Sequence, residues 1–502
     1  MRDTVRGGDS GFRERSAAGR TVSVAAIVPR ARFIGCDDIA TTGITDVASR
    51  CGPGDVFVAR LTERGDGHDA VARAVSRGVS GVIAERVVPT SGVPLCVVPD
   101  STWTHARLSH ALAGDPARRL RVIAVTGTSG KTTTAWLTAA ALMDEVGTVG
   151  MLSDVGCLGP EGSEPMATDL AQPAGLAAAL ARLADSGCTH VVLEVSSRQL
   201  AGHALAGVAC DTVVVTIVAR AHLDLHGTAR AYRRIKSRIL DTLAPDGCLV
   251  ADGDGRLDRL LRRAAARSCE GAAATTSLTA GFRSRCDVRG RIVERGRDGQ
   301  TFMLTTGGRT VPVTLASPLR SFTRDALLAA AVGLRYGLEP RALAHALEAA
   351  DVVPGRMERL DRGQDVPVFV DAASSGHALA STLGGLRRLT PGRLVLLAAE
   401  STALAVAGRG GLERRVSRWC DECLVAPPSM VDEDCDATAL AAYARIDRLM
   451  SSLGSRDCVL VLDGPAGGRG PDHRGVPLAA LIDGWLRLAH DPGLADAWRH
   501  AA

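Results

Sequence analysis

The chain has 502 residues, of which 46% are hydrophobic and 23% charged, and its formal net charge is +4. This length predicts about three domains, and no apolar run is long enough for a transmembrane helix. Charges of both signs are interspersed, which leaves no basic stripe for nucleic acid. The 13 cysteines are scattered and odd in number, which indicates reduced thiols in the cytoplasm rather than a disulfide framework.

Along the chain, an arginine-bearing leader over residues 1–28 is expected to be disordered, and residues 31–117 alternate short strands and helices in a small separate unit. A buried strand is expected at 121–126, followed by a Gly-rich turn and a helix that begins at Lys131. The remaining expected elements are strands at 190–195, 211–217 and 247–251, helices near 174–185 and 228–243, a hairpin over 300–315, and a second series of strands near 366, 393–399 and 457–462. This alternation predicts α/β units with largely parallel sheets.

The turn after the first of these strands has the composition of a phosphate loop. Glycine lets backbone N–H groups approach phosphate oxygens, and the following helix adds the partial positive charge of its N-terminus. Lys131 is expected to reach the outer phosphates of ATP, and the Thr132 hydroxyl to bind Mg²⁺. The longer phosphate-loop pattern is not met, because Val125 occupies the place of its first glycine. The loop residues are Gly127, Thr128, Ser129, Gly130, Lys131, Thr132 and Thr133.

Lysine is almost absent from this chain. The 59 basic residues include only two lysines, Lys131 and Lys236. Lysine is a primary amine that can be covalently modified, whereas arginine is a planar fork that stays charged. The two retained lysines are therefore candidates for chemistry that a guanidinium cannot perform.

Several further segments, taken in order, resemble motifs of the Mur ligases. These are Ser49-Arg50 with the segments 53–59 and 66–69, Leu-Glu-Val-Ser-Ser at 193–197, His-Leu-Asp-Leu-His-Gly at 222–227, Ala-Tyr-Arg-Arg-Ile-Lys at 231–236, and Pro-Gly-Arg-Met-Glu-Arg at 354–359. Within the family the details are most similar to the MurE type, the UDP-N-acetylmuramoyl-tripeptide synthetases. The resemblance covers roughly residues 31–385 and is specific, because the motifs keep their order and spacing.

The resemblance implies an α/β fold of three domains. After the leader at 1–28 these are an N-terminal UDP-substrate domain over 29–118, a central P-loop-type ATPase with a parallel sheet over 119–355, and a divergent Rossmann-like domain over 356–502. It also implies a cytoplasmic monomer of cell-wall synthesis that uses ATP and Mg²⁺. Its substrates would be a UDP-linked muramoyl peptide, or a similar carboxylate, and an amino acid.

In the implied reaction, the substrate carboxylate takes the γ-phosphoryl group of ATP, and an amine then attacks the acyl phosphate. Thr132 and Glu194 would hold one Mg²⁺, and His222 and a carbamylated Lys236 a second. Arg356 and Asp371 would line the nucleotide, and Ser49 and Ser196 the other substrate. The plainer alternative for each charged residue is a solvated side chain without a role in chemistry.

The chain also departs from the family. Arg198 replaces a histidine, and Gly202 and Ala204 stand where a glutamine and an arginine grip the UDP-linked peptide. The late motifs that hold the incoming amino acid have no match. Two alternatives therefore stay open: a Mur-like ligase with a substrate outside peptidoglycan, and a paralogue that binds ATP without catalysis.

Overall fold

The computed structural model describes residues 14–16, 19–62, 65–143, 145–219, 226–255, 276–350, 352–373, 375–407, 411–426, 437–463 and 478–490. The chain forms two compact units. The first unit comprises Met1–Val122, Ala167–Thr189 and Ser196–Ala209, and the second comprises Ile123–Met166, His190–Val195 and Cys210–Ala502. No described helix is long and apolar enough to cross a membrane.

The first unit is built on a six-stranded sheet in the order β1-β5-β6-β9-β10-β3. Its four middle strands are parallel, and apolar runs such as Val56-Phe57-Val58 are buried there, as expected for strands covered on both faces. The strands are β1 Glu14–Arg15, β2 Val22–Ser23, β3 Arg32–Ile34, β4 Ala40–Thr41, β5 Gly43–Thr45, β6 Asp55–Val58, β7 Leu61–Thr62, β8 Gly65–Asp66, β9 Gly81–Ala84 and β10 Leu95–Val97. The helices are α1 Val24–Ile27, η1 Ala48–Arg50, η2 Gly67–Ala70, α2 Val71–Val75, α3 Ser101–Leu112, η3 Pro116–Arg119, α5 Pro173–Asp185 and α6 Ser197–Ala201.

The expectation of a disordered leader up to residue 28 is wrong for its last part. Strand β2 pairs with β4, and helix α1 follows it directly. Val22 and Val24 are buried in the same apolar core as Ile44 and Val56. Elements this short carry little periodic signal in the sequence, and burial against the sheet is what orders them. Residues 1–13 lie outside the described part of the chain.

The second unit contains an eleven-stranded sheet in the order β14-β13-β12-β15-β11-β16-β17-β18-β19-β20-β21. Strands β12 and β15 are parallel, as are β16 to β19, and antiparallel hairpins close both edges. The strands are β11 Arg121–Thr126, β12 Val149–Ser153, β13 Gly156–Gly159, β14 Gly162–Glu164, β15 His190–Val195, β16 Cys210–Val215, β17 Leu243–Asp252, β18 Thr276–Gly281, β19 Val288–Arg295, β20 Gln300–Thr306 and β21 Arg309–Leu315.

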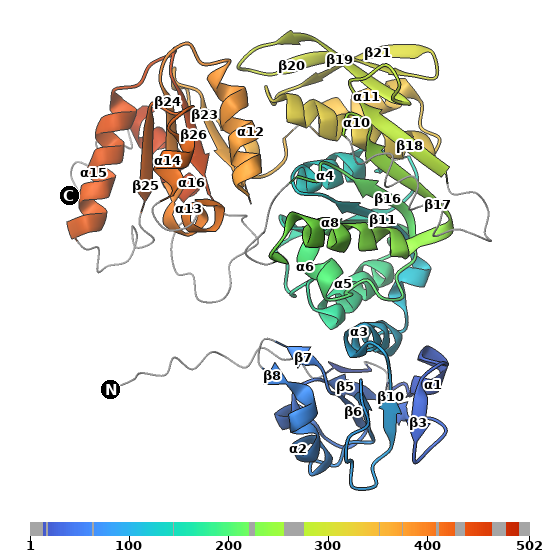
Figure 1. Cartoon of the computed structure of the whole chain (residues 1–502). Helices are drawn as coiled ribbons and strands as arrows, with labels where there is room; N and C mark the ends of the chain where they lie inside the picture. The colour runs from blue at the N-terminus through green and yellow to red at the C-terminus, as the bar shows by residue number, and fades with distance from the viewer. Residues whose placement is uncertain are drawn as a thin grey trace. The chain divides into compact units, whose positions relative to one another are not determined.

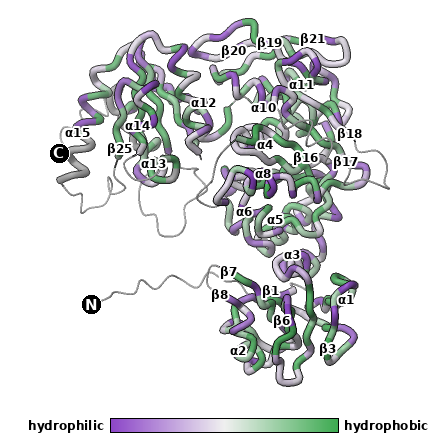
Figure 2. The backbone as a smooth tube through the Cα atoms, in the orientation of Figure 1, coloured by the Kyte–Doolittle hydropathy of each residue, from purple (hydrophilic) through white to green (hydrophobic). Residues whose placement is uncertain are grey.

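Helices α4 (Lys131–Leu142) and α10 (Arg320–Arg335) lie side by side in this unit (Figure 1). Both are rich in alanine and leucine, and one continuous core joins them to the sheet and to α11 (Pro340–Ala349). By contrast, α8 (Ala229–Ser237) is strongly hydrophilic (Figure 2) and buries only Tyr232 and Lys236. It ends earlier than the expected helix over 228–243, because residues Arg238–Thr242 tighten into the 3₁₀-helix η4 before β17 begins.

The C-terminal part of the second unit is a five-stranded sheet in the order β22-β23-β26-β24-β25. Four of its strands are parallel, and helices cover both faces, so separate apolar cores lie on the two sides. Its elements are β22 Arg356–Leu360, β23 Val368–Asp371, α12 Gly376–Arg387, β24 Leu394–Ala399, α13 Glu400–Ala407, α14 Leu412–Val416, β25 Glu422–Ala426, α15 Ala437–Ser451, β26 Cys458–Leu462 and α16 Leu478–His490. This is the doubly wound arrangement of Rossmann-like folds.

Candidate active site

The phosphate loop lies between β11 and α4, where the carboxyl end of a central strand meets a helix N-terminus. Gly127 and Gly130 have positive φ angles of 157° and 84°. A Cβ atom on Gly127 would run into the Thr216 hydroxyl, which donates to the Ser129 carbonyl at 2.7 Å. The loop is also held by a 2.7 Å hydrogen bond from the Thr128 N–H to the Ile217 carbonyl. Glycine is therefore required for this close approach of loop and strand.

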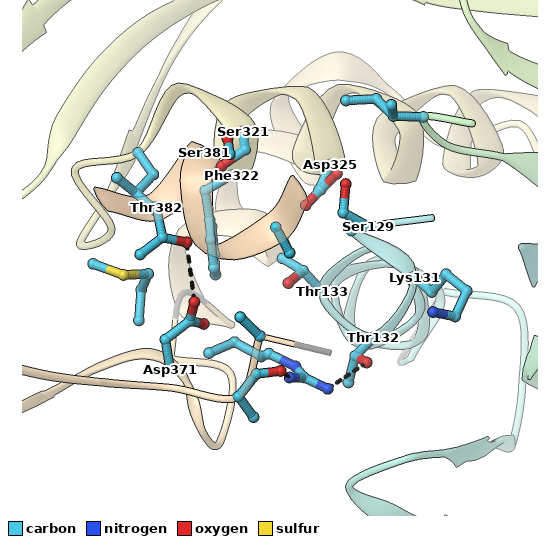
Figure 3. Close-up of a pocket in the computed structure, with 18 of the residues that line it drawn as sticks. Ser129, Lys131, Thr132, Thr133, Ser321, Phe322, Asp325, Asp371, Ser381 and Thr382 are labelled. Atoms are coloured by element: carbon cyan, nitrogen blue, oxygen red, sulfur yellow. Dashed lines mark hydrogen bonds between the residues drawn. The ribbon is translucent and has the colours of Figure 1, made fainter. Parts of the chain in front are cut away.

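A cavity of about 90 Å³, open to solvent on one side, lies against this loop. Figure 3 shows Asp325 beside Ser129 on one side and Asp371 with Thr382 on the other. The lining residues come from the loop and α4 (Ser129 to Thr133), from Asp154 and Ile217, from the start of α10 (Leu319, Ser321, Phe322, Asp325), and from β22, β23 and α12 (Arg356, Met357, Asp371, Ala372, Ala373, Ala378, Ser381, Thr382).

Glu194, at the carboxyl end of β15, is buried behind the pocket with 4% of its surface exposed. Its carboxylate accepts a hydrogen bond from the Thr132 hydroxyl at 2.8 Å and lies 3.5 Å from the Lys131 ammonium. Burial works to raise the pKa of this carboxyl, but the charges of Lys131 and Arg356, with the Thr132 hydrogen bond, lower it. Glu194 is therefore ionised and linked directly to the first turn of α4.

Arg356 connects the C-terminal sheet to the loop. Its guanidinium donates to the Thr132 hydroxyl at 2.9 Å and to the Ala372 carbonyl. Asp371 pairs with Arg356 in the β22–β23 register and accepts a 3.0 Å hydrogen bond from the Thr382 hydroxyl. Burial raises the pKa of Asp371, although the Arg356 charge opposes this shift. Both residues line the pocket.

Lys236 is buried in α8, with 4% of its surface exposed. Its amine donates a 2.9 Å hydrogen bond to the Thr126 hydroxyl, which in turn donates to the Val195 carbonyl at 2.7 Å. The pKa of the amine lies well below its usual range, first because burial disfavours the cation and second because Lys131 is nearby. Burial therefore disfavours the charged form of this primary amine next to the phosphate loop.

Comparisons with known proteins agree with this geometry. The model of the Mur ligase middle domain matches residues 125–333. A UDP-N-acetylmuramyl-tripeptide synthetase of Roseiflexus sp. is 32% identical over 414 residues, 78% of this chain and 79% of the relative. A UDP-N-acetylmuramoyl-L-alanyl-D-glutamate–2,6-diaminopimelate ligase of Streptomyces avermitilis is 32% identical over 76% of this chain and 73% of its own.

This chain belongs to the Mur ligase family. It is a MurE-like, ATP-dependent amide ligase. Among solved structures, a UDP-N-acetylmuramoyl-L-alanyl-D-glutamate–2,6-diaminopimelate ligase matches with a TM-score of 0.65, 20% identity and coverage of 94% of this chain and 99% of its own. The MurF ligase of Thermotoga maritima in complex with ADP matches with a TM-score of 0.53, 20% identity and coverage of 85% and 94%. The mixed α/β architecture with three principal sheets is that of the Mur ligases.

Not all predicted site residues of this Mur ligase line the pocket. The Thr128 hydroxyl is engaged by the Tyr232 hydroxyl at 2.9 Å and by the backbone of Ala219. In the first unit, Ser49 lies in η1, and the Ser196 hydroxyl caps α6 by accepting from the Gln199 N–H at 3.2 Å. His222 lies outside the described residues.

Two acidic residues that line the pocket of the Mur ligase, Asp154 and Asp325, were not among the predicted site residues. Asp154 follows β12, and the neighbouring Glu194 carboxylate is the main cause of its raised pKa, with burial second. Asp325 lies on α10 against Gly130, and burial raises its pKa well above the usual range. Asp325 stands where the resemblance expects an asparagine, and Asp154 stands in no motif; the fold brings both to the loop. A weak signal existed for Asp154, because it follows a buried strand directly.

The residues at the loop suit a divalent cation. The described residues contain no group of three or more His, Cys, Asp or Glu side chains arranged to hold a metal. However, the Oε1 atom of Glu194 is buried without a hydrogen-bond partner among the described residues, and the Thr132 hydroxyl is adjacent. Carboxylate and hydroxyl oxygens are the ligands that Mg²⁺ prefers, in sites that phosphates complete. The described cysteines, including Cys420 and Cys423, are free thiols.

Proposed function

We propose that this Mur ligase joins an amino acid to the carboxylate of a UDP-linked muramoyl peptide, with ATP as phosphoryl donor and Mg²⁺ as metal. The observation that carries the proposal is the buried amine of Lys236, which hydrogen-bonds to Thr126 at the end of the strand that leads into the phosphate loop. ATP binding alone requires no second lysine there. Relatives named as UDP-N-acetylmuramyl-tripeptide synthetases support the substrate assignment.

The chain's own residues account for the first chemical step. The loop N–H groups and Lys131 hold the outer phosphates, and Arg356 reaches the same point from β22. An oxygen of the substrate carboxylate forms a bond to the γ-phosphorus, and the bond from that phosphorus to the ADP oxygen breaks. Bound at Thr132 and Glu194, Mg²⁺ would supply neutralisation of phosphate charge. The incoming amine then attacks the acyl carbon, loses a proton to solvent and expels phosphate, which leaves the amide.

Lys236 is proposed to act as its carbamate. The neutral amine would attack CO₂, forming a C–N bond and releasing one proton to solvent, and the new group would be an anion. Burial favours this route, because it lowers the pKa of the amine and so disfavours the unreactive ammonium form. Arginine cannot take part in this reaction, which accounts for a lysine in a helix whose other basic residues are arginine. We propose that His222 and the Lys236 carbamate together would bind a second Mg²⁺.

The domain assignment follows the same reasoning. We propose an N-terminal substrate domain over 29–118, a central ATPase over 119–355 and a C-terminal domain over 356–502, acting as a monomer. Apart from β1 (Glu14–Arg15), the strands of the three principal sheets fall into these ranges. The pocket takes residues from both of the last two ranges, so movement of the C-terminal domain would open and close the nucleotide site.

One observation favours a second candidate, a Mur-like ligase with a different carboxylate substrate. Ala204, at the position of an expected arginine grip, is fully buried, and its carbonyl accepts a 2.8 Å hydrogen bond from His110. His110 is itself buried. This segment therefore packs into the core of the first unit, where it presents no charged side chain to a substrate.

The test is ADP release by the purified chain with ATP, Mg²⁺, bicarbonate, UDP-muramoyl-dipeptide and a panel of amino acids. The variant is Lys236→Ala, and the matched control is Arg234→Ala, a basic residue exposed on the same helix. Release that needs one amino acid, is lost in Lys236→Ala and persists in Arg234→Ala supports the proposal. If only a different carboxylate stimulates release, the second candidate holds. If nothing stimulates release, the chain binds ATP without ligation.

A further inference from the structure

Asp154 occupies a fixed position at the carboxyl end of two parallel strands. Strand β12 runs parallel to β15 with Leu152 opposite Leu193, so the next residue, Ser153, comes level with Glu194, and Asp154 follows directly. The Asp154 N–H donates to the Glu194 carboxylate at 3.3 Å. The antiparallel pair Ser153–Gly156 leaves only two residues in the turn between β12 and β13. A two-residue hairpin turn has little conformational freedom, so it holds the Asp154 side chain in a defined position.

The surroundings of Asp154 are those of a cation site. It lines the nucleotide pocket and is accessible to solvent there, whereas Glu194 beside it is buried. The Glu194 Oε1 atom has no hydrogen-bond partner among the described residues, and its nearest cation is the Lys131 ammonium at 3.5 Å. Triphosphate entering this pocket adds further negative charge next to both carboxylates. A divalent cation between these groups would offset this added negative charge.

We propose that Asp154 is a second carboxylate ligand, with Glu194 and Thr132, for the divalent cation that accompanies the nucleotide. This inference rests on the proposed function, because that function supplies the Mg-nucleotide. A ligand set with an additional carboxylate binds a divalent cation more tightly, since affinity rises with the number of anionic ligands. Asp154 would thus set the metal affinity of the nucleotide complex and leave the metal-free nucleotide little changed.

The test measures metal binding directly. Mn²⁺ is titrated into the full-length protein with ADP, and free Mn²⁺ is followed by electron paramagnetic resonance. The variants are Asp154→Asn, Asp154→Glu and Glu194→Gln, with Asp246→Asn as an exposed control away from the pocket. Asp154→Asn is expected to weaken Mn²⁺ binding about tenfold, Asp154→Glu to recover part of the loss, and Asp246→Asn to match the wild type. Binding of a fluorescent ADP analogue in EDTA checks the fold and the metal-free site.

The outcomes separate this inference from the proposed function. If Glu194→Gln loses Mn²⁺ while Asp154→Asn binds like the wild type, the inference is overturned and the ligase proposal stands. Equal losses of Mn²⁺ and of metal-free nucleotide in Asp154→Asn would show a structural role and also overturn it. If Asp154→Asn loses only Mn²⁺ but no acceptor stimulates ADP release, the metal site stands and the ligase proposal fails.

Discussion

The contact between Gly130 and Asp325 makes a quantitative prediction for Gly130→Ala. Gly130 has φ +84°, and a Cβ atom there would lie 2.9 Å from the Asp325 Cγ and closer still to a carboxyl oxygen. A left-handed alanine costs about 1–2 kcal/mol, and overpacking at a buried contact about 1–3 kcal/mol. Asp325 is buried on α10 and cannot turn away freely. The substitution should therefore destabilise the folded conformation of the loop by about 2–5 kcal/mol. If about 1.4 kcal/mol of this appears in nucleotide binding, the affinity for ATP should fall at least tenfold.

Two further variants separate the backbone contribution to this cost from the steric contribution. Gly308→Ala, in the β20–β21 turn, has nearly the same φ of +79° but nothing within 4 Å of the added Cβ, so it isolates the backbone term. Asp325→Ala combined with Gly130→Ala removes the steric term, and the double variant should recover about 1–3 kcal/mol. The assay is binding of a fluorescent ATP analogue, with the thermal midpoint of the nucleotide-stabilised transition as the second readout. Equal losses in Gly130→Ala and Gly308→Ala, or no recovery in the double variant, would refute the reasoning.

Three other predictions concern the groups around the phosphate loop. Tyr232→Phe removes the hydroxyl that bonds Thr128 at 2.9 Å, so ATP-analogue affinity should fall by a factor that corresponds to about 1 kcal/mol; an unchanged affinity would contradict this. Arg356→Lys keeps the charge but cannot span the Thr132 hydroxyl and the Ala372 carbonyl together, so the KM for ATP should rise about tenfold, and an unchanged KM would show that charge alone suffices. Because the folded-state pKa of Lys236 is depressed, the unfolded chain binds more protons between that pKa and about 10.4. In CO₂-free buffer, the free energy of unfolding should therefore rise with pH between these two pKa values, by at most about 1.4 kcal/mol per pH unit. The free energy of unfolding of Lys236→Met, measured with urea, should lack this rise. If the variant and the wild type show the same pH dependence, the pKa of Lys236 is not depressed in the folded state.

The elements that the sequence predicts well carry a local signal. The β11 strand, the phosphate loop and α4 have continuous apolar runs and glycines at fixed positions, and the hairpin turns at Gly307 and Gly308 as expected. Lys236 stands out by composition alone, because lysine is so rare. The sequence does not predict β2 and α1, because both are too short to show a periodic pattern. The helix expected over 228–243 ends early, because Arg238–Thr242, with Ile239 and Leu240 buried, form η4 directly before β17.

The missed pocket residues depend on tertiary structure. Asp154 reaches Glu194 because the β12–β15 register places two distant segments together. Asp325 reaches the loop because α10 packs against α4, and no local pattern predicts that contact. Ser196, which the resemblance predicts to contact substrate, caps α6 with its hydroxyl in this structure. A serine at a strand-to-helix turn serves capping as readily as binding.

The most direct test of the central claim follows one oxygen atom. UDP-muramoyl-dipeptide labelled with ¹⁸O in its acceptor carboxylate is incubated with ATP, Mg²⁺, bicarbonate and the amino acid that stimulates ADP release, and the phosphate released is analysed by mass spectrometry. Transfer of the γ-phosphoryl group to the carboxylate, followed by attack of the amine, predicts one ¹⁸O atom in each phosphate formed. Unlabelled phosphate released with ADP would mean that water, not the carboxylate, accepts the phosphoryl group, and would contradict the assignment of this chain as an active ligase for that substrate.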